Sequence, residues 1–306
     1  MCCLFGMIDY GRSFTGKQKI KMIHTLATSA EARGTDASGI AYNSGGKLRV
    51  CKRPVPGHRL PLRIPDDAAV IMGHTRLTTQ GDGKRNYNNH PFQGRAGQTA
   101  FALAHNGVLN NDRQLRWALR LPRTKIETDS FIAVQLLQQQ RALNFDSLRY
   151  MAETVEGSFT FTVLDGQDNL YFVKGDSPLC ICHFPDRGLY LYTSTRAILL
   201  EALTHIPCLN GEAEQVAIDG GELLMIGPDG TQKRSAFRYS DPAALSWFGY
   251  EGQCCRPHRR DRNGDYTRAL KSVAGFYGIS PDQIDQLLNN GFTHEEIEDY
   301  LYCREM

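Results

Sequence analysis

Met1-Cys2-Cys3-Leu4-Phe5-Gly6 opens the sequence and decides how the rest of it is interpreted. The apolar residues from Leu4 to Asp9 are typical of a buried strand. Removal of Met1, which the small second residue favours, would leave Cys2 with a thiol and a free α-amino group. An α-amino group has an ordinary pKa of about 7.7–8.0 and can serve as the general base for its own thiol. The sequence therefore predicts an N-terminal nucleophile that requires no separate histidine.

The composition is that of an ordinary globular protein. The 306 residues are 41% apolar and 22% charged, with a net charge of +2, which favours one large core and argues against disorder. Nucleic-acid binding depends on clustered Lys and Arg, so the near-neutral charge argues against a nucleic-acid partner. The one stretch that we identify as locally basic, Arg256–Arg262, is better explained as a solvated linker.

Cysteine usage and the absence of targeting patterns favour the cytoplasm. Nine cysteines in a chain of this length are too few for a disulfide scaffold, and their number is odd. The first residues lack the basic region of a secretion signal, and no apolar run approaches the ~20 residues of a membrane span. We expect reduced thiols, a cytoplasmic location and no membrane contact.

Residues 1–239 are predicted to form one α+β domain with substantial antiparallel sheet, because short β-rich runs alternate with turn signals and a few helical stretches. The strand candidates are Leu4–Asp9, Gly39–Tyr42, Leu48–Arg53, Ala68–Thr75, Ala100–Asn106, Phe159–Leu164, Leu170–Lys174, Leu179–His183, Leu189–Ser194 and Glu222–Ile226. The helix candidates are Lys17–Ala30, Asn111–Leu119, Asp129–Gln140, Asn144–Thr154 and Thr195–Leu203. The segment Gly81–Gly97 is interpreted as an ordered loop between strands.

A linker and a small helical module are predicted after this domain. Residues 240–265 show no clear periodicity of apolar residues, and residues 266–306 are predicted to form three short helices. The first helix is Tyr266–Tyr277, and the capping boxes Ser280–Gln283 and Thr293–Glu296 open the second and third. The module resembles a ubiquitin-associated-type bundle. A packing appendage or a dimer contact explains it better, so a homo-oligomer is among the partners that we consider.

Asn106-Gly107 follows an apolar strand and offers donors for an oxyanion. Attack by a thiol on an amide carbonyl produces a tetrahedral oxyanion that preorganised N–H groups can stabilise. A side-chain amide and a backbone N–H in a tight turn would supply them. Alone, the dipeptide favours a hairpin turn over an oxyanion site.

Arg76 and Asp129 provide opposite charges that suit a free amino acid. A guanidinium can hold an α-carboxylate with two parallel donors, and a carboxylate can accept from an α-ammonium group. Taken singly, Arg76 fits a surface ion pair, and Asp129 fits a helix start.

Five ordered segments resemble the glutaminase domain of the class II glutamine amidotransferases. They are Met1–Gly6, Arg33–Gly39, Gly73–Gly81, His105–Leu109 and Glu127–Ser130. The order and number of the motifs make chance an unsatisfactory explanation. The resemblance spans roughly the first 230 residues, and Glu156–Phe159 matches a further strand of the family.

The resemblance implies a fold and a catalytic apparatus. The fold is the four-layer αββα sandwich of the N-terminal-nucleophile hydrolases, here with the small C-terminal helical module. Cys2 would be the nucleophile, with Asn106 and Gly107 forming the oxyanion hole. Neither a metal nor an organic cofactor is implied.

The same resemblance implies a substrate pocket for L-glutamine. Arg76 would hold the carboxylate and Asp129 the ammonium group. Thr79 would line the pocket, Gln80 stands where several relatives carry His, and Arg33 would brace the N-terminus.

The sequence departs from the family at two positions. Cys3 occupies the place of a family Gly, and Leu77 replaces a common aromatic residue. Cys3 cannot replace Cys2 as nucleophile, because its α-nitrogen is tied into a peptide bond.

Other chemical motifs are weaker. Cys180–His183 and Cys254–His258 contain metal-ligand residue types without the paired spacing of a zinc site, so we expect no metal. His74, His90 and His105 are expected to be structural. No nucleotide-binding loop is present in the sequence.

We expect a glutamine amidotransferase that releases ammonia through a Cys2 thioester and passes it to a separate ammonia-accepting synthase subunit. Two other functions stay open. One is an N-terminal-nucleophile amidohydrolase acting on a different amide, and the other is a catalytically inactive regulatory subunit.

Overall fold

Two antiparallel sheets form the centre of the molecule. A computed structural model describes residues 2–206, 209, 213–239, 267, 271, 274, 279–290, 292 and 297. The first sheet has the strand order β11-β9-β10-β1-β4-β2-β3, and the second has the order β13-β12-β8-β7-β6-β5. Every strand pair is antiparallel.

The strands of the first sheet are β1 (Cys3–Asp9), β2 (Ala37–Ser44), β3 (Lys47–Arg53), β4 (Val70–Arg76), β9 (Cys180–Phe184), β10 (Leu189–Thr193) and β11 (Glu214–Gln215). Those of the second are β5 (Phe92–Ala96), β6 (Thr99–Leu109), β7 (Gly157–Asp165), β8 (Leu170–Lys174), β12 (Glu222–Ile226) and β13 (Gln232–Ala236).

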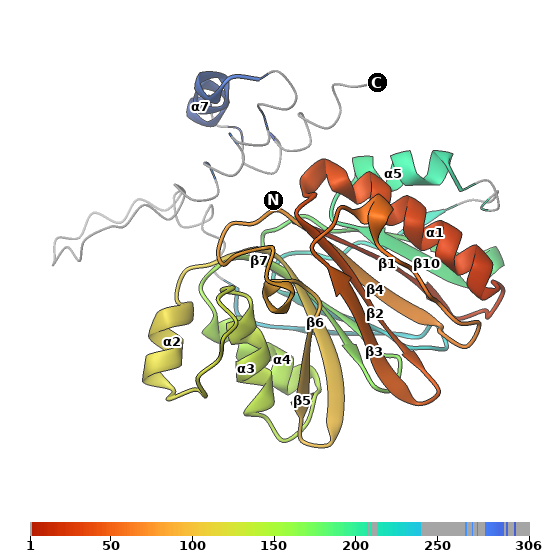
Figure 1. Ribbon diagram of the computed structural model, residues 1–306, viewed down its shortest axis with the longest axis horizontal. Helices are drawn as coiled ribbons and strands as arrows, with labels where there is room; N and C mark the ends of the chain where they lie inside the picture. The colour runs from red at the N-terminus through yellow and green to blue at the C-terminus, as the bar shows by residue number, and fades with distance from the viewer. Residues whose placement is uncertain are drawn as a thin grey trace, which may run out of the picture.

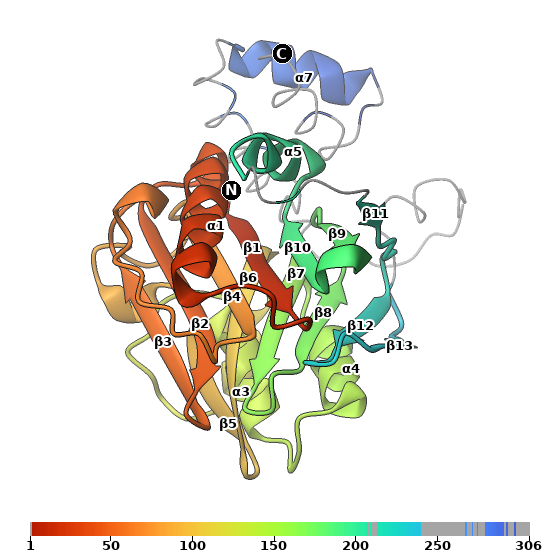
Figure 2. The same ribbon diagram turned by 90° about the vertical axis from the view of Figure 1, so that its right-hand side faces the viewer.

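Helices cover the outer face of each sheet (Figures 1 and 2). The helices are α1 (Gly16–Ser29) and α5 (Arg196–Thr204) on the first sheet, and α3 (Phe131–Gln138) and α4 (Phe145–Thr154) on the second. The shorter α2 (Asp112–Ala118) packs beside α3. Single 3-10 turns are η1 (Ala30–Arg33), η2 (Gly57–Arg59), η3 (Asn86–Asn88) and η4 (Pro185–Arg187). This arrangement confirms the predicted αββα sandwich.

Alternation along β1 places its side chains in two different cores. Cys3, Phe5 and Met7 pack against the helices α1 and α5, whereas Leu4 and Ile8 lie between the two sheets. A strand buried on both faces reads as a continuous apolar run, as this one does. The Cys3 side chain, which replaces a family Gly, is fully buried on the helix side.

A buried ion pair fixes α1 over the end of β1. Lys19 Nζ lies 3.1 Å from Asp9 Oδ2, and both side chains are buried. The same ammonium group donates to the carbonyl oxygens of Asp66 at 2.9 Å and Ala68 at 2.8 Å. Every charge-bearing atom is thereby paired, which is the condition for burying an ion pair at low cost.

All predicted strands and helices of this domain are present, with slightly different ends, but three strands were not predicted. The prediction that Gly81–Gly97 is a loop is wrong, because the segment contains η3 and β5. Gly94 and the preceding Pro91 obscured β5 in the sequence. The short β11 and the polar edge strand β13 carry no apolar alternation that would reveal them.

The C-terminal part is described only in pieces. Helix α7 (Pro281–Asn289) begins at the predicted capping box, in which the Ser280 side chain accepts from the Gln283 N–H. The linker 240–265 lies outside the described residues, as do most of Tyr266–Tyr277 and the helix predicted from Thr293. The domain boundaries therefore stay predictions. Within the described residues, no helix combines the length and apolar character needed to cross a bilayer.

Three buried histidines lie where the two sheets meet. His74 Nε2 donates to the His105 carbonyl oxygen at 3.0 Å, and the rings of His74 and His90 are 4.2 Å apart. Burial lowers the pKa of His74 to about 3 and that of His105 to about 4, and it lowers the pKa of His90 well below its usual value. All three are therefore neutral in the folded protein at pH 7.

This cluster predicts acid-sensitive stability. The unfolded chain binds protons below a histidine pKa of about 6.5, whereas the folded protein does not until much lower pH. The contribution of each histidine to stability is therefore fully present above that pH. Between pH 7 and 5 the free energy of unfolding falls by about 2 kcal/mol per buried histidine. Urea unfolding of His90→Leu should show a smaller loss over this interval. His24→Leu, on the exposed face of α1, should keep the wild-type loss; equal losses in His90→Leu and wild type would contradict the assignment.

Candidate active site

The candidate nucleophile lies at one end of the first sheet. Cys3 pairs with Thr75 in the β1–β4 register, so Cys2 precedes β1 beside Arg76, the last residue of β4. The Cys2 thiol is partly exposed and lies 3.6 Å from the Leu77 carbonyl oxygen. Burial raises the pKa of this thiol, whereas the positive chain terminus and Arg76 lower it.

Arg33 connects Cys2 to the second sheet. Its Nε donates to the Cys2 carbonyl oxygen at 2.8 Å, and its Nη2 lies 3.4 Å from Asn106 Oδ1. The guanidinium is almost fully buried at the end of η1. A rigid planar group with several donors can fix two acceptors at once, and here it holds the N-terminus against β6.

Asn106 and Gly107 lie inside β6, which contradicts the predicted tight turn. Asn106 pairs with Thr160 and Gly107 with Phe159 of β7. The Phe159 main chain is engaged elsewhere, with Gly175 N–H and with the Asp176 carboxylate. This leaves the Gly107 N–H outside the ladder at that pair.

The Asn106 amide has one unused donor. The side chain is 1% exposed, and its Oδ1 accepts from Arg33. Among the described residues, no acceptor bonds to Asn106 Nδ2. A buried amide N–H without a partner is costly, which makes this group a candidate donor to a bound molecule.

Arg76 is buried without a countercharge, so the surface ion pair considered from the sequence is wrong. Its side chain is 2% exposed. It donates to Asn89 Oδ1 at 2.6 Å, to the Gln80 carbonyl oxygen at 2.5 Å and to Thr128 Oγ1 at 3.4 Å. No carboxylate forms an ion pair with it in the described part of the chain. A desolvated cation held only by neutral acceptors favours an anionic ligand.

Asp129 supplies the opposite charge. Its carboxylate accepts from Leu109 N–H at 2.7 Å and is buried. Helix α3 starts after Ser130 without a side-chain cap bond. The Ser130 hydroxyl also donates to the Asp129 carboxylate, at the longer distance of 3.4 Å. Burial raises its pKa, and the N–H groups of Leu109 and Ser130 oppose that rise. Both Asp129 and Arg76 lie near enough to Cys2 to shift the pKa of its thiol in opposite directions.

The remaining predicted pocket residues follow β4. Thr79 is exposed. Gln80 holds Arg76 through its carbonyl oxygen, and its side-chain Nε2 donates to the Glu127 carbonyl oxygen at 2.9 Å. The structure thus brings together Cys2, Arg33, Arg76, Gln80, Asn106, Gly107 and Asp129, whereas Thr79 has no side-chain bond among the described residues.

Asn89 and Lys52 are near Arg76 but were not singled out from the sequence. Asn89 is fully buried, and its Nδ2 donates to the Gly83 carbonyl oxygen at 2.8 Å. Lys52 Nζ donates to the Asn89 carbonyl oxygen and lies 4.8 Å from the centre of the Phe92 ring. Burial, with a smaller effect of Arg76, lowers the pKa of Lys52 to about 8. The run of asparagines before Pro91 was the available signal.

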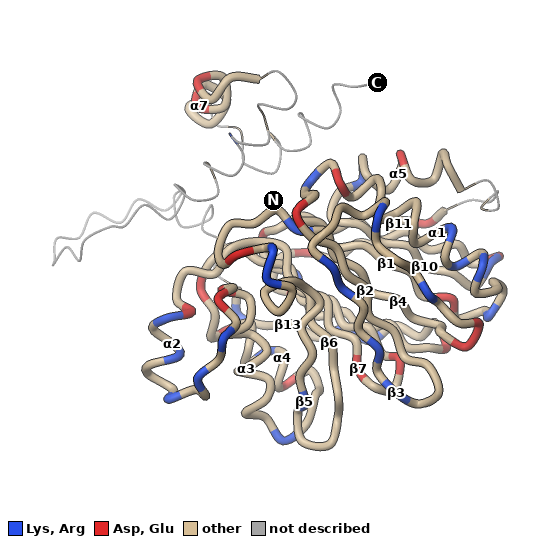
Figure 3. Tube along the Cα trace, viewed as in Figure 1, with Lys and Arg blue, Asp and Glu red and all other residues tan. Residues whose placement is uncertain are grey.

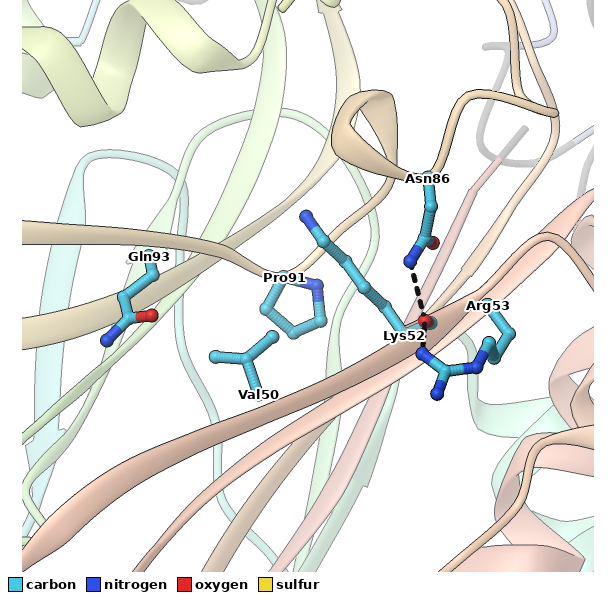
Figure 4. A pocket seen from close by; sticks show the side chains of 6 residues that line it. All are labelled: Val50, Lys52, Arg53, Asn86, Pro91 and Gln93. Carbon is cyan, nitrogen blue, oxygen red and sulfur yellow. Dashed lines mark hydrogen bonds between the residues drawn. The ribbon is translucent and has the colours of Figure 1, made fainter.

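A shallow pocket between β3 and β5 is separate from this constellation. Its lining residues are Val50, Lys52, Arg53, Asn86, Pro91 and Gln93 (Figure 4). None of the predicted site residues lines it. Within the described residues, no group of three or more His, Cys, Asp or Glu is arranged to hold a metal ion.

Gly107 is predicted to be indispensable for the geometry of β6. Its φ is +133°, and an added Cβ would lie 2.0 Å from the Ser158 carbonyl oxygen. Gly107→Ala should destabilise the fold by at least ~3 kcal/mol in urea unfolding. Gly46→Ala is the control, because Gly46 has φ +68° with nothing within 4 Å of the added Cβ and should cost only about 1 kcal/mol. Equal losses would refute the steric argument.

Both the sequence and the fold of this chain are similar to those of known proteins. No protein-family model matches the chain. The glutamine–fructose-6-phosphate aminotransferase (isomerizing) of Halobacterium salinarum is 30% identical over 204 residues, which cover 65% of this chain and 32% of that protein. The Bacillus licheniformis enzyme of the same name is 34% identical over 161 residues, covering 49% and 26%. The chain thus spans about a third or less of the length of these relatives.

Solved structures show the same fold. The glutamine phosphoribosylpyrophosphate amidotransferase of B. subtilis superimposes with a TM-score of 0.61 at 20% identity, covering 78% of this chain and 50% of that one. The structure described as the allosteric regulatory enzyme of purine biosynthesis gives the same TM-score at 19% identity. These relationships confirm the resemblance to the class II glutamine amidotransferases that the ordered motifs indicate, and the solved amidotransferase structures share the αββα fold of this chain.

Proposed function

We propose that this protein hydrolyses the side-chain amide of L-glutamine and releases ammonia. The observation that carries the proposal is the unused Nδ2 donor of Asn106, on the amide that Arg33 connects to Cys2. The relatives' names include glutamine-dependent amino transfer, which supports the same substrate. This chain would share that first half of the reaction.

The first step forms a thioester. Removal of Met1 would free the α-amino group of Cys2, which takes the thiol proton. The thiolate then attacks the amide carbon, and the resulting oxyanion accepts hydrogen bonds from Asn106 Nδ2 and the Gly107 N–H. Collapse of this intermediate breaks the C–N bond, and the α-ammonium group gives its proton to the leaving ammonia.

The second step restores the enzyme. The α-amino group of Cys2 takes a proton from a water molecule, and the water oxygen attacks the thioester carbon. The same two donors stabilise the second oxyanion. The C–S bond then breaks, the thiolate recovers its proton, and glutamate leaves. Each step uses groups of this chain and water alone.

Substrate recognition would depend on two buried charges. The Arg76 guanidinium, held by neutral acceptors, would bind the α-carboxylate of glutamine. The Asp129 carboxylate would accept from the α-ammonium group, with Thr79 and Gln80 beside them. A substrate without a free amino-acid head would leave both charges unpaired, at a cost of a few kcal/mol.

We further propose that a separate polypeptide uses the ammonia. The names of the fructose-6-phosphate relatives include the transfer of the nitrogen. Their alignments with this chain cover only 32% and 26% of those proteins, which leaves room for that second reaction in the unmatched part.

Replacing the nucleophile tests the proposal. Purified wild-type protein should convert glutamine to equal amounts of glutamate and ammonia, whereas Cys2→Ala should lose at least ~10³-fold in rate. Cys51→Ala, which removes a partly buried thiol of β3, should remain active. Turnover that persists in Cys2→Ala would eliminate the mechanism. A wild-type protein that binds glutamine without turnover would point to a regulatory subunit.

The proposed role of the Arg76 charge in binding glutamine can be tested by substituting its neighbour Asn89. Asn89→Asp places a carboxylate against the guanidinium and should raise KM for glutamine at least ~tenfold, with a smaller effect on kcat. Asn89→Ala removes both hydrogen bonds of this side chain, the one from Arg76 and the one to Gly83, without adding charge and should change KM much less. Steady-state kinetics of the two variants separate charge from packing. Equal KM values would mean that Arg76 does not bind the carboxylate.

A further inference from the structure

Trp117 is unusually exposed for its size. Its side chain is 85% accessible and stands on α2, whose Leu115 and Leu119 face the core below α3. An exposed Trp is informative where arginines surround it, because Trp and Arg are both enriched at the centres of protein interfaces. The surroundings of Trp117 are strongly charged.

Two arginines flank Trp117. Arg113 lies four residues before it, the spacing that places two side chains on one face of a helix. Arg120 follows the last residue of α2, Ala118, by two positions. Arg113, Trp117 and Arg120 are all exposed.

Arg120 occupies a position that glycine usually takes. Its φ is +50°. The Arg120 N–H bonds to the Trp117 carbonyl oxygen at 3.2 Å, and the Leu121 N–H bonds to the Arg116 carbonyl oxygen at 3.0 Å. These two bonds form a Schellman motif at the end of α2. Arg120, the second residue after the helix, then has a left-handed backbone conformation, which is unfavourable for a residue with a Cβ. The fold at this place does not require an arginine.

The positive charge of the segment is uncompensated at the surface. Arg123 and Lys125 are exposed, and none of Arg113, Arg120, Arg123 and Lys125 forms an ion pair within the described residues. Lys125 Nζ lies 4.9 Å from the centre of the Tyr87 ring, a contact that leaves its charge without a carboxylate. The one acid of residues 112–126, Asp112, is buried and lies 3.7 Å from Arg116. Figure 3 shows the resulting excess of Lys and Arg along α2 and the segment after it. We call Arg113, Trp117, Arg120, Arg123 and Lys125 the α2 patch.

Helix α2, which carries part of the α2 patch, contacts the segment that leads to Asp129. Arg116, on the inner side of α2, donates to the Thr128 carbonyl oxygen at 3.4 Å. The next residue is Asp129, the candidate ligand of the substrate ammonium group. A partner seated on α2 would therefore lie over the helix that packs against the segment carrying Asp129.

We propose that the α2 patch is the docking surface for a protein partner with an acidic contact face, and that this partner is the enzyme that accepts the ammonia. Its role as acceptor rests on the proposed function. Trp and Arg are enriched at the centres of protein interfaces, where they carry much of the binding energy. Uncompensated cations on one side require carboxylates on the other. A nucleic acid fits less well, because the whole chain has a net charge of only +2.

The partner can be captured through a neighbouring residue that is not itself part of the α2 patch. A photo-crosslinking amino acid replaces exposed Gln114 of α2 in the full chain, expressed in cells of the source organism. The control places it at exposed Arg95 on β5. We expect a protein crosslinked from position 114 but not from 95, with the crosslinked peptides rich in Asp and Glu. No specific crosslink, or a crosslink to nucleic acid, would overturn the proposal.

Affinity measurements with the purified partner complete the test. Trp117→Ala and Arg113→Glu should each weaken binding about tenfold or more, whereas Arg95→Glu should not. Arg120→Gly should weaken binding while the melting temperature stays equal or rises, because glycine relieves the left-handed backbone. Unchanged affinity in all three patch variants would overturn the docking surface.

The glutaminase reaction of the chain alone is measured in parallel. It should be unaffected in the patch variants, since none of these residues belongs to the proposed catalytic or binding groups. Failure of the docking proposal would leave that reaction intact. Failure of the proposed function would abolish the reaction in wild type while crosslinking and affinities persisted.

Discussion

The structure depends on the contact of Arg33 with Cys2 and Asn106. One planar group holds the start of β1 in the first sheet and the middle of β6 in the second. Because its donors are fixed relative to each other, the distance between the N-terminus and the Asn106 amide is fixed as well. Thiol chemistry at a chain terminus needs such a constraint, since termini are ordinarily the least ordered part of a domain.

The electrostatics of the site complement this rigidity. Arg76 and Asp129 are both buried, and in the described structure each is satisfied by neutral groups rather than by the other. Burying unpaired charges is expensive, and a fold retains them where a ligand supplies the missing partner. An amino acid carries both countercharges on one carbon. On the proposed function, the site would gain selectivity for that head group from the same charges that destabilise the empty protein.

Local patterns predicted most of the strands and helices, and the ordered motifs named residues that the structure brings close together. Neither identified the features that only tertiary contacts create. β13 is recognisable only by its partner β12, and β5 was obscured by Gly94. Asn89 carries no signal until the chain brings it against Arg76. The cations of the α2 patch form no compact basic run, because apolar and neutral residues separate them in the sequence. Conversely, the predicted turn at Asn106 was a local interpretation that the β6–β7 pairing overrides.

The central claim is that the reactive sulfur shares its residue with a free amine. Intact-mass analysis of a preparation that consumes glutamine, with sequencing of its first residues, tests this directly. We predict that the active protein begins at Cys2 and that any fraction retaining Met1 is inactive, because its nitrogen is an amide and cannot accept the thiol proton. Active protein in which Met1 is fully retained would contradict the account.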